Sequence, residues 1–498
     1  MLALLALSPC VHASEPAKTP IQIDARAAGA LGDGVHDDRL ALQGALDRLA
    51  VAGGVLDLPA GIYLLGAPLV LRGDGVTVRS EGAILRAGAG FPAGPEPRAL
   101  LAMPAAGDGS AARGIAVLGV ALDGAGIASR ALALERAHDV TVRGVHVRRL
   151  RAGGGGAILV RSSADRETDT GEVTVSENVV ELDEPTSGIV LRNVVNCLVS
   201  GNRVQGTGRE GGHGIDLTLS RGCTVSDNVI LRADVGVLAD ETNHVQLIGN
   251  YVYDARTGFR AGVRPDGRRQ AANNVYVNNR VLTGGSGFVV GGSGMLLIGN
   301  YAAFLKPGPA IWVQGGGTHD ALVGNNPSVA GAAGIRFDAS DGVVVANVPI
   351  SNDGPGIEVN GGRVAVSANA TISNRIGIRL GERARACTVV GNTVEKAAEA
   401  PLVLGGAEHT VRDNTGTGGV LPERGRGATY GSGEADIRAA RTAIAADFPD
   451  DRYLVTVEWA ADPGGREWIA EKTRTGFVIT LPGPPPAPVR VRWLARGL

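Results

Sequence analysis

The sequence is poor in aromatic residues and in cysteine, and it carries almost no net charge. Of its 498 residues only 4% are aromatic and four are cysteines, and the formal net charge is -2. This balance gives no global electrostatic reason to expect nucleic acid or an anionic membrane surface as the partner. No segment after residue 14 offers the ~18 consecutive apolar residues of a membrane span, so no span is predicted.

The cysteines lack the spacing of a metal site or a redox motif. Cys197, Cys223 and Cys387 each lie five residues before an asparagine of the repeat described below, at positions that should face inward. We therefore expect buried thiols and no metal site built from them. Cys197 and Cys223 would be neighbours in a stack, whereas Cys387 would lie seven rungs further on. At most one disulfide is expected.

The N-terminus has the features of a targeting segment. Residues 1–14 form an apolar run that ends in Val11-His12-Ala13, close to the small-x-small pattern at which signal peptidase cleaves. The positively charged start of such segments is missing. We expect a signal peptide over residues 1–14 and a secreted or periplasmic protein.

The most abundant feature is glycine, with 75 residues, between short runs of β-branched side chains. An asparagine follows such a run repeatedly, mostly at intervals of 21 to 26 residues: Asn178, Asn202, Asn228, Asn250, Asn279, Asn300, Asn325, Asn347, Asn369, Asn392 and Asn414. This period fits three short strands and three turns, which make one rung of a parallel β-helix. Asparagine tolerates the left-handed backbone of a tight turn, and stacked asparagines can form a hydrogen-bonded ladder.

A second marker precedes most of these asparagines and gives each rung an outer face. It is a glycine followed by alternating apolar positions, as in Gly188-Ile-Val-Leu and Gly214-Ile-Asp-Leu. Alternation with a period of two places Ile215 and Leu217 inside the coil and Asp216 outside. The chain is therefore predicted to be an all-β solenoid, with any function on the outer face of these glycine strands.

The segment before the repeat resembles the opening segment of the pectate lyase superfamily. Gly-Ala-Leu-Gly-Asp-Gly-Val-His-Asp-Asp at residues 29–38 precedes a predicted helix with Leu42, Ala45, Leu46 and Leu49 on one face. Asp37 or Asp38 would be the N-cap of this helix. The resemblance covers about residues 21–424 and implies a right-handed parallel β-helix plugged by the helix. It also implies that the glycine strands carry the active cleft, as in lyases, hydrolases, epimerases and tailspikes of that superfamily.

Four segments are predicted along the chain. They are the signal peptide (1–14), an N-terminal cap with the helix (21–54), the right-handed β-helix (55–424) and a small C-terminal antiparallel β-domain (435–498). The last segment contains alternating runs such as Tyr453-Leu-Val-Thr-Val-Glu-Trp with Pro-Gly turns between them. We expect it to cap the coil or to mediate oligomerisation.

Loop lengths localise a candidate site. The turns at residues 161–171 and 264–272 are unusually long, and three rungs with short turns lie between them, so they would wall a groove of ~19 Å. The turn that leads into Gly214 is also long and carries Arg209, Glu210 and His213.

The predicted catalytic residues are His213, Asp216, Asp240, Tyr253 and Arg260, and the predicted substrate-binding residues are Arg192, Thr218, Arg264, Trp312 and Gln314. Arg336, Asp338, Glu358 and Arg379 continue the strip and are predicted to be solvated charges.

Two chemistries and a non-catalytic role fit these residues. Elimination or C5 epimerisation of an acidic polysaccharide needs a cation for the uronate, here Arg192, Arg260 or Arg264, with His213 as base and Tyr253 as acid. Asp216 would orient His213 or help hold a cation, so calcium stays open as a cofactor and no other is predicted.

Alternatively, Asp216 and Asp240 would lie ~8 Å apart, which suits an inverting hydrolase. Gly212-His213-Gly214 is similar to the Gly-His-Gly motif of polygalacturonase-type hydrolases, but their Asp-Asp pair is absent one rung earlier. A glycan-binding β-helix without catalysis is the third hypothesis, favoured by the absence of a complete catalytic signature.

Overall fold

The computed structural model describes residues 21–92, 98–103, 112–161, 171–208, 210–262, 271–417, 419–421, 429–449 and 451–497. The predicted signal peptide lies outside these ranges. So do Arg209, Arg264 and most of the two long turns that were predicted to wall a groove.

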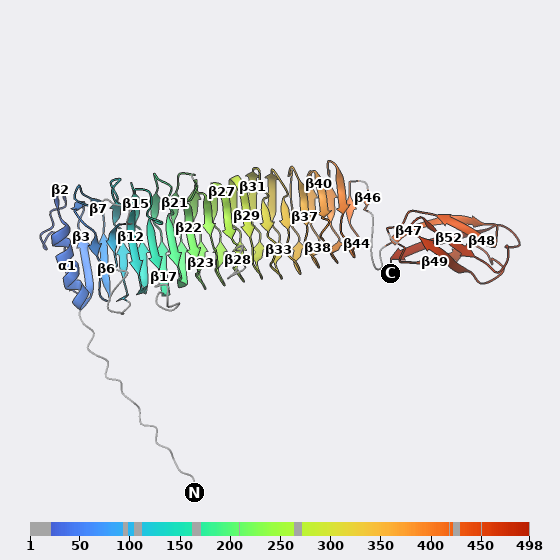
Figure 1. Ribbon diagram of the computed structural model, residues 1–498, viewed down its shortest axis with the longest axis horizontal. Helices are drawn as coiled ribbons and strands as arrows, with labels where there is room; N and C mark the ends of the chain where they lie inside the picture. The colour runs from blue at the N-terminus through green and yellow to red at the C-terminus, as the bar shows by residue number, and fades with distance from the viewer. Residues whose placement is uncertain are drawn as a thin grey trace, which may run out of the picture.

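The repeat forms the predicted right-handed parallel β-helix (Figure 1). One face of the coil is a 16-stranded sheet that runs from β1 (Ile21–Asp24) to β44 (Thr410–Arg412), and strands of the other faces join in a 24-stranded sheet. Neighbouring strands pair in parallel, as β10 (Ala116–Leu118) does with β14 (Val140–Arg143). Equivalent side chains of successive rungs therefore stand in columns along the coil.

Helix α1 (Arg39–Ala52) packs against the first rungs of the coil. Its predicted apolar face is buried, including Leu42 and Leu49, because those positions recur at helical spacing. Asp38 occupies the N-cap position, but its carboxylate makes no capping hydrogen bond. It accepts instead from the backbone N–H groups of Leu31 and Gly32, and so holds the preceding loop on the helix.

The predicted asparagine ladder is present, and all eleven of its members are at most 2% exposed. Asn300 is representative: its Nδ2 donates to Asn325 Oδ1 (3.0 Å) and to the Tyr276 carbonyl (2.9 Å), while its Oδ1 accepts from Asn279. The expected left-handed backbone at these asparagines is wrong. The residue before each one carries the positive φ, as Gly299 does (62°), and that turn directs the asparagine side chain inward.

The inward positions predicted for the three cysteines are confirmed, and two of the thiols are joined in one disulfide. Cys197 and Cys223 lie on neighbouring rungs, with Cα atoms 4.4 Å apart, and form a disulfide. Cys387 is a buried free thiol. Its Sγ approaches the carbonyl oxygens of Gly361 and Arg385 at 3.5 Å, as expected for a thiol packed in the wall of the coil.

The C-terminal residues form two antiparallel three-stranded sheets around their own core. One sheet contains β47 (Thr429–Ile437), β52 (Val489–Gly497) and β49 (Tyr453–Trp459), and the other contains β48 (Arg441–Ala445), β51 (Gly476–Thr480) and β50 (Trp468–Thr473). Phe448, Tyr453, Phe477 and Trp493 form the aromatic part of the core. The module begins with β47, before the boundary predicted at residue 435.

Across the described residues, no helix has the length and apolarity needed to cross a bilayer.

Candidate functional site

The glycine strands stack in register and place one carboxylate among apolar side chains. They include β12 (Arg130–Glu135), β16 (Ile158–Arg161), β19 (Ile189–Arg192), β22 (His213–Thr218) and β25 (Val235–Leu238). Ala133, Leu159, Val190, Asp216 and Leu238 occupy one column on the outer side of these strands. Ile215 and Leu217 point into the coil, as the alternation predicts. Asp216 is therefore the one charged residue among these five, and the column continues after Leu238 with Arg260.

Asp216 is almost fully enclosed, with 3% of its surface exposed, and three polar side chains surround it. Its Oδ1 accepts a hydrogen bond from Thr218 Oγ1 (2.5 Å), and its Oδ2 lies 3.6 Å from Arg192 Nη2 and 3.7 Å from His213 Nδ1. Burial alone would raise the pKa of Asp216, but interactions with His213, Thr218 and Arg192 outweigh it and lower the pKa. Asp216 is thus a stable anion.

A pocket of about 370 Å³ opens over this carboxylate. That volume lies in the lower part of the range for small-molecule sites, about 300–1,000 Å³. The lining residues come mainly from the turns that precede β16, β19 and β22: Gly153, Gly155, Pro185, Thr186, Ser187, Arg192, Gly211, His213 and Asp216. The structure therefore brings together four of the predicted residues: His213, Asp216 and Arg192 in the pocket, with Thr218 behind Asp216.

Asp240 and Arg260 form a separate pair one rung further along. Arg260 Nη2 lies 3.0 Å from Asp240 Oδ2, and the backbone N–H of Gly262 donates to Asp240 Oδ1 at 2.5 Å. Neither side chain lines the described pocket. The carboxylate of Asp240 is thus already held by a guanidinium and a backbone amide.

Tyr253 lies on another side of a corner in the coil. It belongs to β27 (Tyr251–Ala261), where its segment pairs with β24 (Val229–Leu231), whereas the later part of β27 pairs with β25. The corner falls at Asp254, whose φ is 56°. Tyr253 is 42% exposed and does not line the pocket, so the predicted acid does not join His213 there.

Trp312 and Gln314 belong to the continuation of the strip. Trp312 Nε1 donates to Asp338 Oδ2 (2.8 Å), and the Arg336 guanidinium carbon lies 5.0 Å from its ring centroid. Asp338 also accepts from Arg336 and from Asn360. These groups form a cluster instead of the separate solvated charges predicted for Arg336 and Asp338, because stacked rungs bring their columns into contact. Gln314 follows the strand β32 (Ile311–Val313), with its backbone N–H bonded to Val290.

Sequence reasoning missed the turns that enclose the pocket. Thr186 and Ser187 line it, and Ser187 Oγ accepts from the backbone N–H of His213 at 3.3 Å. Gly153 and Gly155, from a run of four consecutive glycines at 153–156, also line it. This glycine run was the available signal, since such a run marks a close approach of the backbone to another group.

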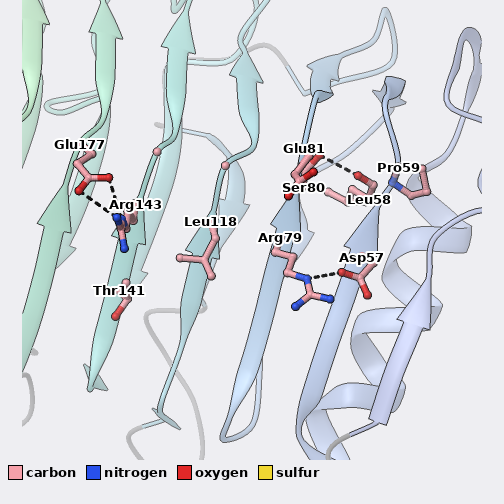
Figure 2. Close-up of a pocket in the computed structure, with 12 residues that line it drawn as sticks. Asp57, Leu58, Pro59, Arg79, Ser80, Glu81, Leu118, Thr141, Arg143 and Glu177 are labelled. Atoms are coloured by element: carbon pink, nitrogen blue, oxygen red, sulfur yellow. Dashed lines mark hydrogen bonds and ion pairs between the residues drawn. The ribbon is translucent and has the colours of Figure 1, made fainter.

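A larger hollow of about 840 Å³ lies on the 16-stranded sheet near the N-terminal end of the coil (Figure 2). Four of its charged side chains form two ion pairs: Arg79 Nε lies 2.5 Å from Asp57, and Arg143 binds Glu177 through two nitrogens at 2.9 and 3.1 Å (Figure 2). No histidine lines it. The pocket over Asp216 is the better candidate, because its charges converge without satisfying one another fully.

The described residues contain no group of three or more His, Cys, Asp or Glu side chains arranged to hold a metal ion. In the candidate pocket, His213 and Asp216 are the side chains of these types, and the guanidinium of Arg192 stands beside them. A cation would have to compete with this fixed positive charge.

Comparison with solved structures supports the fold. The chain is similar to the tailspike protein of E. coli bacteriophage HK620 in complex with a pentasaccharide, at 12% identity over 96% of this chain and 94% of the tailspike, with a TM-score of 0.55. An N-terminal fragment of bacteriophage Phi29 gene product 12 is 13% identical, with coverages of 80% and 71% and a TM-score of 0.58. The A-module of mannuronan C-5 epimerase AlgE6 from Azotobacter vinelandii is 18% identical over 79% and 99% of the chains, but its TM-score is 0.43.

Comparison at the level of sequence identifies a family. No relative is found among curated proteins. A family described as periplasmic copper-binding protein (NosD) matches residues 123–302 and 302–420, which together exceed half of the chain. The β-helix fold implied by the pectate lyase resemblance is thus supported, while membership of that superfamily stays a prediction. Because the match covers most of the repeat, the protein belongs to the NosD family.

Proposed function

We propose that this protein is an exported enzyme that acts on an acidic polysaccharide, by elimination or C5 epimerisation, in the pocket over Asp216. The observation that carries the proposal is the contact of one enclosed carboxylate with both a histidine and an arginine: Asp216 with His213 and Arg192. A base next to a cation is what removal of a proton beside a uronate carboxylate requires.

Each side chain has a distinct role in this proposal. Arg192 is half-exposed and neutralises the substrate carboxylate, which makes the adjacent C5 proton more acidic. His213 accepts that proton. In elimination the electron pair of the C5–H bond forms the C4–C5 double bond as the C4–O bond breaks, and the protonated imidazole gives its proton to the leaving oxygen; in epimerisation water returns a proton to C5 from the opposite face and the imidazole releases its proton to solvent. Asp216 faces Nδ1 of His213 and favours the tautomer with its proton there, which leaves Nε2 as the basic nitrogen. Thr218 holds Asp216 in place and does not contact the sugar.

The electrostatics favour this chemistry over inverting hydrolysis by Asp216 and Asp240. A hydrolase needs one carboxylic acid that stays protonated to donate to the leaving group. The pKa of Asp216 is lowered by its partners, so it is unsuited to that role. Asp240 in turn is bound by Arg260 and by the backbone of Gly262.

An oligosaccharide is also a reasonable ligand for a coil of this architecture. The HK620 tailspike, which shares the fold, is solved in complex with a pentasaccharide. The periplasmic description of the NosD family and the Cys197–Cys223 disulfide both support an oxidising compartment outside the cytoplasm. A secreted or periplasmic location is therefore part of the proposal.

The family description makes copper the first metal to consider, but the described residues do not fit a copper centre. Copper prefers imidazole and sulfur ligands. Cys197 and Cys223 are joined to each other, and the free thiol of Cys387 is buried against carbonyl oxygens. In the pocket, a single histidine stands beside Arg192. No step of the proposed reaction uses copper.

The decisive experiment is product analysis with the purified protein on polygalacturonate, alginate and a neutral glycan. The proposal predicts either unsaturated products or changed C5 stereochemistry on a uronate polymer, lost in His213→Ala and kept in His244→Ala, a control at an exposed histidine. Repeating the assay with a chelator tests whether calcium takes part.

Other outcomes would replace the proposal. New reducing ends without unsaturation would indicate a hydrolase. Binding without turnover, unchanged in His213→Ala, would indicate a glycan-binding coil. Absence of any altered product on all uronate polymers would defeat the proposed activity.

A further inference from the structure

Three successive strands that lead up to the pocket, β12, β16 and β19, each carry an arginine: Arg130, Arg161 and Arg192. Arg161 and Arg192 are in register on adjacent strands, so their Cα atoms stand about 4.8 Å apart along the coil. Arg130 begins the strand before them, and the charges of Arg161 and Arg192 act on it. Like charges directly opposite on neighbouring strands are destabilising. Such an arrangement calls for a compensating negative charge.

The described carboxylates compensate for only part of this charge. Glu135 Oε2 lies 2.9 Å from Arg161, and Asp216 lies 3.6 Å from Arg192. Among the described residues, no carboxylate lies within ion-pair distance of Arg130, whose Nε donates to the carbonyl of Gly154. Burial, followed by repulsion from Arg161 and Arg192, lowers the pKa of Arg130 despite the attraction of Glu135. Among the described residues, the guanidiniums of Arg130, Arg161 and Arg192 thus have two carboxylates, Glu135 and Asp216, as ion-pair partners.

The glycine run at 153–156 contacts Arg130 and contributes Gly153 and Gly155 to the lining of the pocket. A Cβ on Gly154 would lie 1.9 Å from the carbonyl oxygen of Ser129, and one on Gly156 would lie 2.5 Å from the Val190 side chain. Gly155 has a φ of 70°, and a Cβ there would lie 3.6 Å from Arg130 Nη2. Glycine at these positions lets the turn pack closely against Ser129 and Val190, and the Arg130 guanidinium lies next to Gly155, which lines the pocket.

We propose that Arg130 and Arg161, beside the Gly153–Gly156 turn, form an anionic subsite for the carboxylate of a second uronate, next to the sugar held over Asp216. This inference rests on the proposed function and adds a direction to it: the polymer lies along the coil axis and continues from Arg192 toward the N-terminal rungs. A carboxylate at this subsite neutralises the excess charge, and two charge-assisted contacts give it preference over a neutral sugar.

The test is the affinity of galacturonate and mannuronate trimers, each as the free acid and as the methyl ester, measured by calorimetry. A His213→Ala background prevents turnover during the measurement. In that background Arg130→Gln should weaken binding of one free-acid trimer about 10- to 100-fold and leave the binding of its ester unchanged. Arg143→Gln, on the 16-stranded sheet, is the matched control and should change neither affinity.

Equal loss for acid and ester, or no loss for either acid, would overturn the subsite. If Arg130→Gln does not fold, Arg161→Gln offers the same test at a half-exposed position. The two proposals can fail separately. Arg130-dependent binding of an acidic trimer by a protein that turns over no uronate polymer would defeat the proposed reaction and keep the subsite. Turnover that depends on His213, together with a trimer affinity that does not change in Arg130→Gln or Arg161→Gln, would keep the proposed reaction and defeat the subsite.

Discussion

Asp320 and Asn274 stand in one column of the coil, and each accepts a hydrogen bond from the backbone of the preceding rung. Asn274 Oδ1 accepts from Val245 N at 2.9 Å, and Asp320 Oδ1 accepts from Met295 N at 2.8 Å. Both side chains are buried. The second oxygen of Asp320 has no hydrogen-bond partner among the described atoms, and burial raises the pKa of Asp320 to about 6.

Replacing Asp320 by asparagine should stabilise the protein at neutral and alkaline pH. The pKa of Asp320 is higher in the folded chain than its ordinary value of 3.8, so its contribution to stability is present below pH 3.8 and lost as the pH rises through about 6. We expect Asp320→Asn to raise the free energy of unfolding by about 1–3 kcal/mol at pH 8 and by little at pH 4. Denaturant unfolding at both pH values measures this.

The reverse change in the same column is the matched control for that prediction. Asn274→Asp places a carboxylate in an equivalent buried position and should destabilise the protein at pH 8. Equal effects of Asp320→Asn at both pH values would show that ionisation of Asp320 is not the cause.

Removing one member of the asparagine ladder should be costly. Asn300→Ala removes the acceptor of two buried donors on Asn279 and the side-chain donor to the Tyr276 carbonyl, while Asn325 Oδ1 keeps only the backbone N–H of residue 300. We expect a loss of about 3 kcal/mol or more in the free energy of unfolding. Asn326→Ala, beside the ladder, is the control and should cost much less. Similar losses for the two variants would contradict the energetic role assigned to the ladder.

The Cys197–Cys223 disulfide should contribute measurable stability, although its neighbours in the coil are already ordered. The two cysteines are separated by 26 residues, for which chain-entropy arguments give about 3–4 kcal/mol as an upper limit. A reducing agent should therefore lower the unfolding temperature of the wild-type protein. It should have no such effect on a variant with alanine at both positions, while Cys387→Ala should respond like the wild type.

Asp216→Asn should separate orientation of the base from binding of the sugar. Asparagine can fill the same space but does not favour the tautomer of His213 that carries its proton on Nδ1. We expect kcat to fall by about 100-fold or more, with a small change in KM. Asp240→Asn should retain activity, since Asp240 is engaged with Arg260. Loss of activity in Asp240→Asn would return the hydrolase hypothesis to consideration.

Asp216 also predicts an acid limit on stability. Its pKa is lowered in the folded chain, so its interactions with His213, Thr218 and Arg192 stabilise the protein above pH 3.8 and are lost as the pH falls below that value. The wild-type protein should therefore lose more stability between pH 5 and pH 3 than Asp216→Asn does. Parallel unfolding curves for the two proteins over this range would contradict the lowered pKa.

The coil could be predicted from the sequence because most rungs need an asparagine at the same position. An inward amide must be present wherever the ladder continues, as at Asn369 and Asn392, so the period is visible in the sequence. The backbone detail was not visible: the left-handed residue is the one before the asparagine, and Ala346 and Ala368 adopt that conformation without being glycine.

The candidate site could be predicted only where it lies on strands. Alternation identified Asp216, and the turn length identified His213. Arg130 and the turn at 153–156 were missed because their contacts join rungs, and the path of a turn between rungs has no periodic signal. Tyr253 was placed with the site because the corner at Asp254, which turns the chain to another face, leaves no mark in the hydrophobic pattern.

The ladder also bears on how many rungs a protein of this kind can have. The amide of an interior asparagine such as Asn300 is satisfied by the rungs on either side of it, so its requirements are met by any rung of the same pattern. Stability then becomes a sum over neighbours, and whole rungs can be gained or lost as units without disturbing distant ones. The rungs after Val359, far from the pocket, can therefore vary in number during evolution while the chemistry at His213 is kept.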